Sequence, residues 1–171
     1  MRMGRFRMSE KRDVKPHIVR LQQRKSGAET CANMMANSEP WITLRRDYDA
    51  SLKNLTDPSK EVYLALVDDE IAGFTILNMQ GAFGYIQSVC VAPQWRNRGI
   101  GSHLMDFLEK RIFSETPNAF ICVSSFNRGV QRLYERRGYE VIGELKDFIV
   151  PGHSEILLRK TIAPLTDFKR E

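Results

Sequence analysis

The chain has 171 residues, of which 42% are hydrophobic and 27% charged. This is the composition of a single globular domain and excludes a disordered or fibrous protein. No apolar run approaches the about 20 residues of a membrane span. The basic start of the chain has no apolar stretch behind it, so it is not a secretory signal. We therefore expect a cytoplasmic protein with no membrane partner.

Most of the net charge of +5 lies at the N-terminus, because residues 1–15 contain six basic and two acidic side chains. A nucleic-acid surface needs basic residues gathered on a folded face. We therefore expect a solvated basic tail over residues 1–15 and no nucleic-acid partner. The domain is expected over residues 16–162, followed by a short C-terminal tail at 163–171.

Cysteines and histidines are few and scattered. The three cysteines are Cys31, Cys90 and Cys122, and no pair of them has the spacing of a zinc motif. We expect no metal site and reduced thiols, as is usual in the cytoplasm.

The first half of the domain predicts one strand, two helices and three further strands. Helical spacing of apolar residues indicates the helices, and alternation indicates the strands. The expected elements are a strand at His17–Gln22, helices at Ala28–Asn37 and Ile42–Leu55, and strands at Glu61–Asp68, Ile71–Met79 and Tyr85–Val91. Glu39-Pro40 separates the helices, since the residue before a proline avoids the helical conformation. Short turns between the three strands favour an antiparallel meander.

The second half alternates helices and strands. The expected elements are a helix at Gly101–Ser114, a strand at Ala119–Val123, a helix at Arg128–Arg137, and strands at Tyr139–Val150 and Glu155–Lys160. The order β α α β β β α β α β β predicts an α+β domain with a mixed, mostly antiparallel twisted sheet and flanking helices.

A basic, glycine-bearing loop joins the meander to the next helix. It begins at the strand end Val89-Cys90-Val91-Ala92-Pro93 and continues as Arg96-Asn97-Arg98-Gly99-Ile100-Gly101. Free backbone N–H groups and the helix dipole attract anions at a helix start, and glycine lets a ligand approach the backbone closely. The loop favours a phosphate or pyrophosphate ligand, although a G-x-G start also occurs in ordinary tight turns.

A second pattern follows the next strand. It runs from Asn127 through Leu133-Tyr134 to Gly138-Tyr139, in the form N-x-x-x-x-x-L-Y-x-x-x-G-Y. Alone, this pattern is typical of a capped helix with a core Leu-Tyr pair.

Together, the two patterns resemble those of the GNAT superfamily of acyl-CoA-dependent N-acyltransferases. Arg96–Gly101 matches the family's Q/R-x-x-G-x-G/A signature, and Val89–Pro93 matches its V-x-V-x-P strand end. Asn127–Tyr139 matches N-x-x-A-x-x-L-Y-x-x-x-G-F, with Val130 and Tyr139 as the two differences. The order of elements agrees along residues 16–160.

The resemblance implies a GNAT-like fold in which the central strand and its neighbour splay apart at a bulge. Acetyl-CoA, as cosubstrate, would lie in that opening. The residues that this implies for cofactor binding are Val89, Cys90 and Val91 along pantetheine, Arg96, Asn97, Arg98, Gly99, Ile100, Gly101 and Ser102 at the pyrophosphate, and Asn127 at the cofactor arm. Tyr134 would lie beside the sulfur.

The resemblance also implies direct transfer of an acetyl group to a primary amine in a ternary complex. The attacking amine must be neutral, so a base or a water chain is needed. The oxyanion needs fixed N–H donors, and Tyr134, protonated at neutral pH, can give the departing thiolate a proton. Ser88, or Glu155 acting through water, is the expected proton acceptor.

The sequence identifies the amine acceptor less well than it identifies the cofactor. Peptide N-terminal acetyltransferases of the ribosomal-protein type carry E-V-R-x-S-N before the Leu-Tyr helix, whereas this chain has Cys122-Val123-Ser124-Ser125-Phe126-Asn127. Cys122 replaces the glutamate that helps to take the amine proton, which favours a small-molecule amine over a protein N-terminus. Further candidates on the acceptor side are Glu39, Trp41, Tyr48, Gln87, Asp147 and His153.

Two alternatives stay open from the sequence: a protein or peptide N-acetyltransferase, and a non-catalytic acyl-CoA-binding regulatory module of the same fold. Family members often dimerise, and the last hairpin, residues 139–160, offers a sheet edge. A homodimer is therefore expected.

Overall fold

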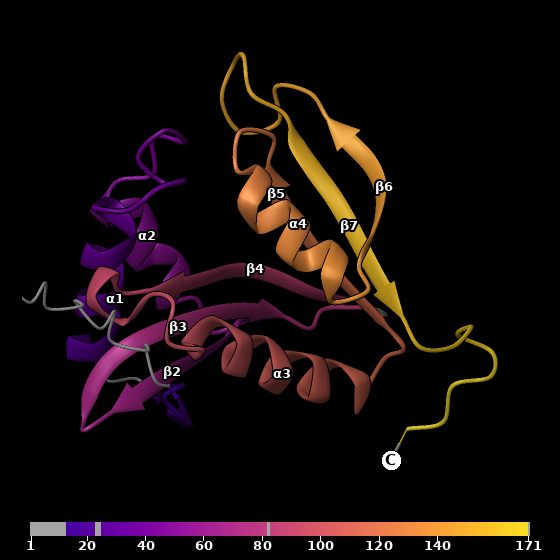
Figure 1. Cartoon of the computed structure of the whole chain (residues 1–171), viewed down its shortest axis with the longest axis horizontal. Helices are drawn as coiled ribbons and strands as arrows, with labels where there is room; N and C mark the ends of the chain where they lie inside the picture. Colours follow the sequence, from indigo (N-terminus) through magenta and orange to yellow (C-terminus); the bar gives the residue numbers. More distant parts are fainter. Residues whose placement is uncertain (1–12, 23–24, 82, 171) are drawn as a thin grey trace, which may run out of the picture.

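The computed structural model describes residues 13–22, 25–81 and 83–170. Its elements follow the predicted order, with one added 3-10 turn, and form a mixed α+β fold (Figure 1). They are β1 (His17–Arg20), α1 (Lys25–Ala36), α2 (Tyr48–Leu55), β2 (Glu61–Val67), β3 (Glu70–Asn78), β4 (Gly84–Val91), the 3-10 turn η1 (Pro93–Trp95), α3 (Ile100–Phe113), β5 (Asn118–Ser124), α4 (Arg128–Arg136), β6 (Glu140–Leu145) and β7 (Glu155–Thr161).

The strands of the described residues form one seven-stranded sheet in the order β1-β2-β3-β4-β5-β7-β6. Only β4 and β5 run parallel, and every other neighbouring pair is antiparallel. The predicted meander is therefore confirmed. β7 lies between β5 and β6, so β6 is the edge strand.

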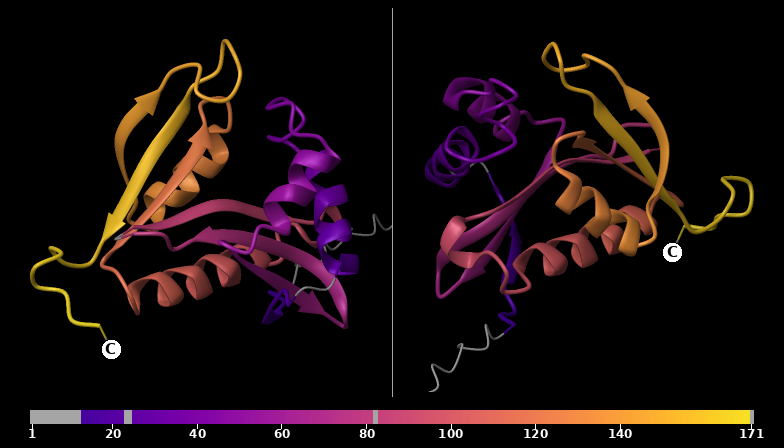
Figure 2. Two further views of the ribbon diagram at one scale, coloured as in Figure 1. Left: turned by 180° about the vertical axis from the view of Figure 1, so that it is seen from behind. Right: turned by 45° about the horizontal axis from the view of Figure 1, so that its top comes forward.

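Helices cover both faces of the sheet (Figure 2). On one face, Cys31 and Met35 of α1 share an apolar cluster with Phe74 of β3. On the other face, Leu108 of α3 and Tyr134 of α4 share a second cluster with residues of β4 and β5. Helices thus cover one face of the sheet at β2 and β3 and the other face at β4 and β5, whereas the edge strand β6 is largely exposed.

The central strand β4 contains a bulge at the point where the sheet opens. Ile76 of β3 pairs with Ser88 and Leu77 pairs with Ile86, so Gln87 has no partner on β3. The parallel pairing of β4 with β5 is limited to residues 84–86. Beyond these residues the two halves of the sheet diverge, as Figures 1 and 2 show. The expected splay at a bulge is confirmed.

Two predicted boundaries were wrong by more than three residues, and smaller differences occur at the end of β1 and the start of α1. α2 begins at Tyr48 rather than Ile42, because the Asp47 carboxylate accepts a hydrogen bond from the Ala50 N–H at 2.9 Å and caps the helix there. β6 ends at Leu145 rather than Val150. Residues 146–154 form a loop in which the Asp147 carboxylate accepts a hydrogen bond from the Gly152 N–H at 2.6 Å.

Both ends of the described chain contact the domain. Val14, expected to lie in the basic tail, donates its N–H to the Arg98 carbonyl at 3.0 Å and packs against the cluster that contains Ile100 and Leu104. Residues 1–12 lie outside the described residues. Near the C-terminus, the Arg170 side chain donates to the Glu115 carbonyl at 3.3 Å. Within the described ranges, no helix combines the length and apolar character needed to cross a membrane.

Candidate active site

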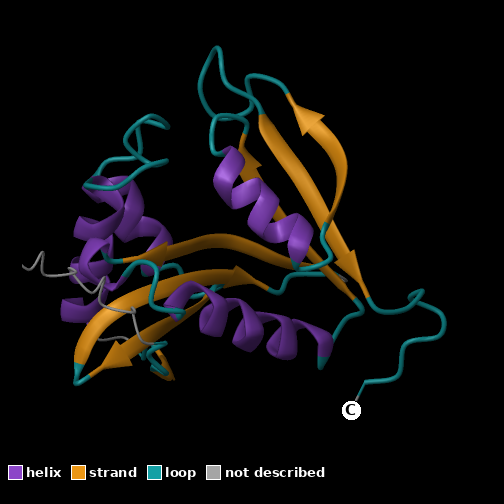
Figure 3. Cartoon of the chain, viewed as in Figure 1, coloured by secondary structure: helices purple, strands orange, loops and turns teal. Residues whose placement is uncertain are grey.

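A cavity of about 450 Å³ lies where β4 and β5 separate. Its floor and walls come from residues 85–91 of β4, residues 121–124 of β5 and the start of α4. Two segments drawn as loops in Figure 3, residues 37–47 before α2 and residues 146–154 between β6 and β7, also contribute lining residues. The cavity therefore joins both halves of the sheet.

The backbone of β4 presents unpaired polar groups to this cavity. In an antiparallel ladder, successive residues direct their N–H and C=O groups to opposite sides. The Ser88 carbonyl faces β3, where it accepts a hydrogen bond from the Thr75 hydroxyl at 2.7 Å. The peptide groups of Val89 and Val91 therefore face the opening, and the Arg96 Nε–H indeed donates to the Val91 carbonyl at 3.1 Å. The N–H groups on this side are placed to receive a ligand.

The loop before α3 is shaped as an anion site. Asn97 and Gly99 have positive φ angles of 57° and 83°, and the first intrahelical bond runs from the His103 N–H to the Gly99 carbonyl at 3.0 Å. The N–H groups of residues 100–102 precede this bond and have no helical acceptor. A Cβ placed on Gly101 would lie 3.7 Å from Val91 Cγ2, so the fold itself leaves room for a side chain there.

The same loop is anchored to the β2–β3 hairpin and carries two cations. The indole N–H of Trp95 and the side-chain amide of Gln94 both donate to Glu70 Oε1, at 3.1 Å and 2.8 Å. The Arg98 guanidinium lies 5.2 Å from the centre of the Trp95 ring, and Arg96 is exposed. Free N–H groups at a helix start, together with these cations, suit a diphosphate.

Tyr134 and Asn127 line the cavity from the α4 side. The Tyr134 side chain is 7% exposed, and its burial raises the pKa of the phenol to about 12. Its hydroxyl makes no hydrogen bond with any described residue. Asn127 occupies the N-cap position of α4 without a side-chain capping bond, so its amide is available at the cavity wall.

The two expected proton acceptors also line the cavity. Ser88 is buried on β4, one residue after the bulge. Glu155, the first residue of β7, is only 4% exposed and accepts a hydrogen bond from the Ser124 hydroxyl at 2.6 Å. Burial raises the pKa of the Glu155 carboxyl above its ordinary value, although the Ser124 hydrogen bond and the charge of Arg46 oppose the change.

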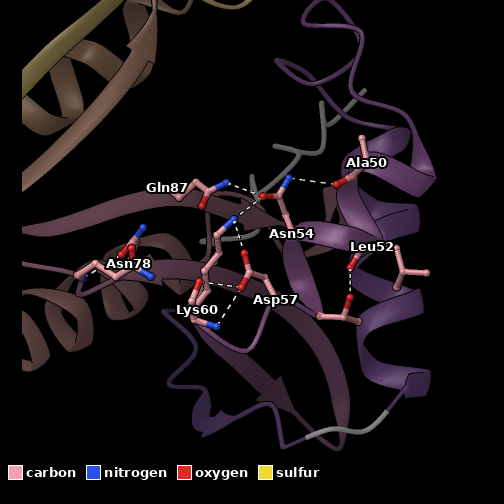
Figure 4. Close-up of polar contacts among 10 residues, drawn as sticks. Ala50, Leu52, Asn54, Asp57, Lys60, Asn78 and Gln87 are labelled. Atoms are coloured by element: carbon pink, nitrogen blue, oxygen red, sulfur yellow. Dashed lines mark hydrogen bonds and ion pairs between the residues drawn. The ribbon is translucent and has the colours of Figure 1, made fainter.

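Gln87 lines the cavity, but its side-chain amide is bound elsewhere. Figure 4 shows this amide donating to Asn54 Oδ1 of α2, at 3.0 Å, and the same oxygen accepts a hydrogen bond from Lys60. Glu39 and Trp41 do line the cavity. Tyr48, Asp147 and His153 do not, so the structure brings together only part of the expected acceptor side.

The lining residues that were not expected as part of the site include four with polar or aromatic side chains: Arg46, Tyr85, Ser124 and Phe148. The sequence placed Arg46 inside a regular helix, where a charged side chain ordinarily faces solvent. In the structure it precedes the N-cap Asp47, in an irregular segment that reaches the cavity. Among the described residues, no group of three histidine, cysteine, aspartate or glutamate side chains could hold a metal ion.

A family model described as "Acetyltransferase (GNAT) family" matches residues 28–139, more than half of the chain. The chain belongs to this family. The match runs from within α1 to Tyr139 and thus includes both of the patterns that line or border the cavity.

Solved structures share the GNAT fold. A GNAT acetyltransferase from Elizabethkingia anophelis with acetyl-CoA bound is 22% identical, with a TM-score of 0.67 over 86% of this chain and 99% of that one. The aminoglycoside 6'-N-acetyltransferase from Enterococcus faecium is 16% identical, with a TM-score of 0.67 over 86% and 98%. The ribosomal-protein-S18-alanine N-acetyltransferase from Escherichia coli is 16% identical, with a TM-score of 0.71 over 86% and 94%. At these identities the likeness establishes the fold of this GNAT chain.

One curated relative, the chloroplastic GCN5-related N-acetyltransferase 6 of Arabidopsis thaliana, is 29% identical over 72 residues. The match covers 40% of this GNAT chain and 25% of the length of that relative.

Proposed function

We propose that this GNAT chain is an acetyl-CoA-dependent N-acetyltransferase that moves the acetyl group directly to a primary amine of a small molecule. The observation that carries the proposal is the cavity at the β4–β5 separation. Backbone N–H groups of β4, the Tyr134 phenol and the Glu155 carboxylate border one enclosed space. These are the donor, acid and base that acyl transfer to an amine requires.

Acetyl-CoA binding is assigned to three parts of the chain. The N–H groups of residues 100–102, with Arg96 and Arg98, would hold the pyrophosphate. The peptide groups of Val89 and Val91 would pair with pantetheine in the place that β5 leaves open, and Asn127 would contact the cofactor arm. The acetyl-CoA seen in the GNAT structure from Elizabethkingia anophelis supports this cosubstrate.

Each group that lines the cavity then has a separate role in the transfer of the acetyl group. Glu155 takes a proton from the ammonium group, directly or through water, and the neutral nitrogen attacks the thioester carbonyl carbon. The N–H groups that face the opening stabilise the negative charge on the carbonyl oxygen. The carbon–sulfur bond breaks, and Tyr134 gives its proton to the leaving thiolate. The new amide nitrogen then loses its second proton, which returns to the Tyr134 phenolate through water. Ser88, beside the bulge, is the alternative proton acceptor.

The rival enzyme class is a protein or peptide N-acetyltransferase. The Escherichia coli enzyme of that class is similar in fold to this chain. Cys122 argues against this class, because it lines the cavity at the position where the ribosomal-protein type carries glutamate. Burial raises the pKa of its thiol, so Cys122 stays protonated at neutral pH and does not accept the amine proton.

A homodimer forms part of the proposal. The edge strand β6 leaves one backbone edge unpaired and exposes Val141 and Ile142, which are about half exposed. An edge of this kind is a template for pairing with a second copy. Light scattering on the purified chain tests it, since a mass near 19.7 kDa would indicate a monomer.

The direct test of the activity is a spectrophotometric assay of CoA thiol release, with acetyl-CoA and a panel of amines and N-terminal peptides. We expect turnover with one or more small amines and little with peptides. Preferred turnover of a peptide would favour the rival enzyme class. Acetyl-CoA binding in calorimetry without turnover of any amine or peptide would favour the non-catalytic module.

A further inference from the structure

Two opposite charges, one from each half of the molecule, line the cavity. Arg46 comes from the segment before α2, and Glu155 begins β7. Glu155 is almost fully buried and held by Ser124, so its position is fixed. Arg46 is half-buried.

Among the residues that the structure describes, the Arg46 guanidinium has no anionic partner. Within the described chain this guanidinium makes no hydrogen bond or ion pair. The two other half-buried arginines, one in α3 and one at the C-terminal end of α4, both form ion pairs. Arg111 pairs with Glu61 and Glu115, and Arg137 pairs with Asp106 and Glu109. An arginine removed from water without a partner is costly, so Arg46 is available for an anion that enters the cavity.

Arg46 and Glu155 influence each other without touching. The charge of Arg46 lowers the pKa of the Glu155 carboxyl and that of the Tyr85 phenol, both of which burial raises. No ion pair joins Arg46 to either side chain in the described chain. A space therefore remains between a fixed carboxylate and an unpaired guanidinium, on the wall of one cavity.

We infer that the amine acceptor is an amino acid, whose ammonium group binds Glu155 and whose carboxylate binds Arg46. This inference rests on the proposed acetyltransferase function and names its substrate class. A guanidinium binds a carboxylate through two parallel hydrogen bonds, which fixes orientation as well as charge. The ammonium group gives its proton to Glu155, and the freed nitrogen then attacks the thioester carbon.

The rest of the lining favours an apolar side chain on that amino acid. Trp41 borders the cavity as a buried ring, and Phe148, in the β6–β7 loop, is 61% exposed. A polycationic acceptor would instead bring positive charge against Arg46. Glu39, the other acidic lining residue, is exposed, and its carboxylate accepts a hydrogen bond from the Thr43 N–H at 3.2 Å.

The experiment uses matched acceptors that differ only in the carboxylate. CoA release is measured for each proteinogenic amino acid, its carboxamide and its decarboxylated amine, and rates are compared per neutral amine because the carboxamide lowers the amine pKa. For an apolar amino acid such as leucine or phenylalanine, we expect kcat/KM to exceed that of both analogues by about 10- to 100-fold, the worth of a charge-assisted hydrogen-bond pair.

Variants of Arg46 provide the second arm. Arg46→Gln should raise KM for the amino acid by about 10- to 100-fold and should remove the preference for the amino acid over its decarboxylated amine. Arg46→Lys should restore part of the difference, because it keeps the charge without the planar fork. Arg45→Gln, at the exposed neighbouring position, is the matched control and should leave both values unchanged.

Calorimetry supplies a readout that does not depend on turnover. The amino acid should bind to the CoA-loaded wild-type chain and should lose that binding in Arg46→Gln. The inference is overturned if carboxamides or decarboxylated amines are acetylated as well as amino acids, or if Arg46→Gln leaves the preference intact. Failure of the chain to bind acetyl-CoA, or to acetylate any amine, would instead overturn the proposed function.

Discussion

Replacing Tyr134 by phenylalanine removes one oxygen from the cavity wall and keeps the ring. The ring packs in the cluster of α3, α4 and β5, and its centre lies 5.9 Å from that of Tyr139. The hydroxyl makes no hydrogen bond within the described chain. Its removal therefore leaves no partner unsatisfied, and the free energy of unfolding should change by less than about 0.5 kcal/mol.

Activity should respond far more strongly than stability. The pKa of Tyr134 is raised to about 12, so the phenol holds its proton throughout the working range and is able to donate it. General acid catalysis contributes about 10²- to 10⁴-fold, and water can replace part of it here, so we expect kcat to fall by roughly 100-fold. The value of kcat/KM should fall with it, while KM for acetyl-CoA changes little.

The matched control is Tyr139→Phe. Tyr139 has the same side chain in the same cluster, but its buried hydroxyl meets no partner with hydrogen-bond geometry in the described chain, and it does not line the cavity. This variant should keep full activity, and its free energy of unfolding should be unchanged or raised by up to about 1 kcal/mol. An unchanged kcat in Tyr134→Phe, with the chemical step shown to be rate-limiting, would refute the acid role.

Three further results are expected. Gly101→Val should weaken CoA binding at least 100-fold in calorimetry, which corresponds to about 2.7 kcal/mol. The melting temperature should be nearly unchanged, because the unliganded fold has room for the valine side chain, whereas that side chain would block a bound diphosphate. Gly129→Val, at the same position of α4 with open space around it, is its control, and equal CoA affinity in the two variants would place the pyrophosphate elsewhere. Deletion of residues 1–12 should leave the melting temperature unchanged, whereas deletion through Val14 should lower it, because Val14 packs against the cluster that contains Ile100 and Leu104; a large loss from the shorter deletion would contradict this. Burial raises the pKa of Glu155 in the folded chain, so the folded state binds the proton more tightly, and the free energy of unfolding should fall as pH rises from the ordinary carboxyl pKa through the raised one. Glu155→Gln should remove that fall in urea titrations, and an unaltered pH profile would show that the carboxyl is not the cause.

Strong local patterns account for what the sequence predicted. The alternation in β2, β3 and β4 and the glycine-bearing loop before α3 depend on neighbouring residues, and both appear in the structure as expected. The family resemblance added the splay at β4, which single-residue patterns do not contain. The pairing of β7 between β5 and β6 involves distant residues, and the sequence did not predict it.

The acceptor side was predicted less well, because irregular segments determine it. A helical apolar pattern runs through residues 42–55, yet the Asp47 cap delays the helix and turns Arg46 toward the cavity. Gln87 was expected near the amine, but its amide binds Asn54, a residue 33 positions earlier in the sequence. Side-chain partners at this separation follow from tertiary packing, which local patterns do not describe.

The unpaired Gln87 also limits which changes of length the gene can tolerate. Ile86 lies in the cluster on the α3 side, whereas Cys90, an even number of positions later, lies in the cluster on the α1 side, because the extra residue reverses the alternation. An in-frame loss of one codon here would restore a continuous ladder and invert every later side chain of the strand. Insertions and deletions should therefore be rarer in β4 than in the loops around it.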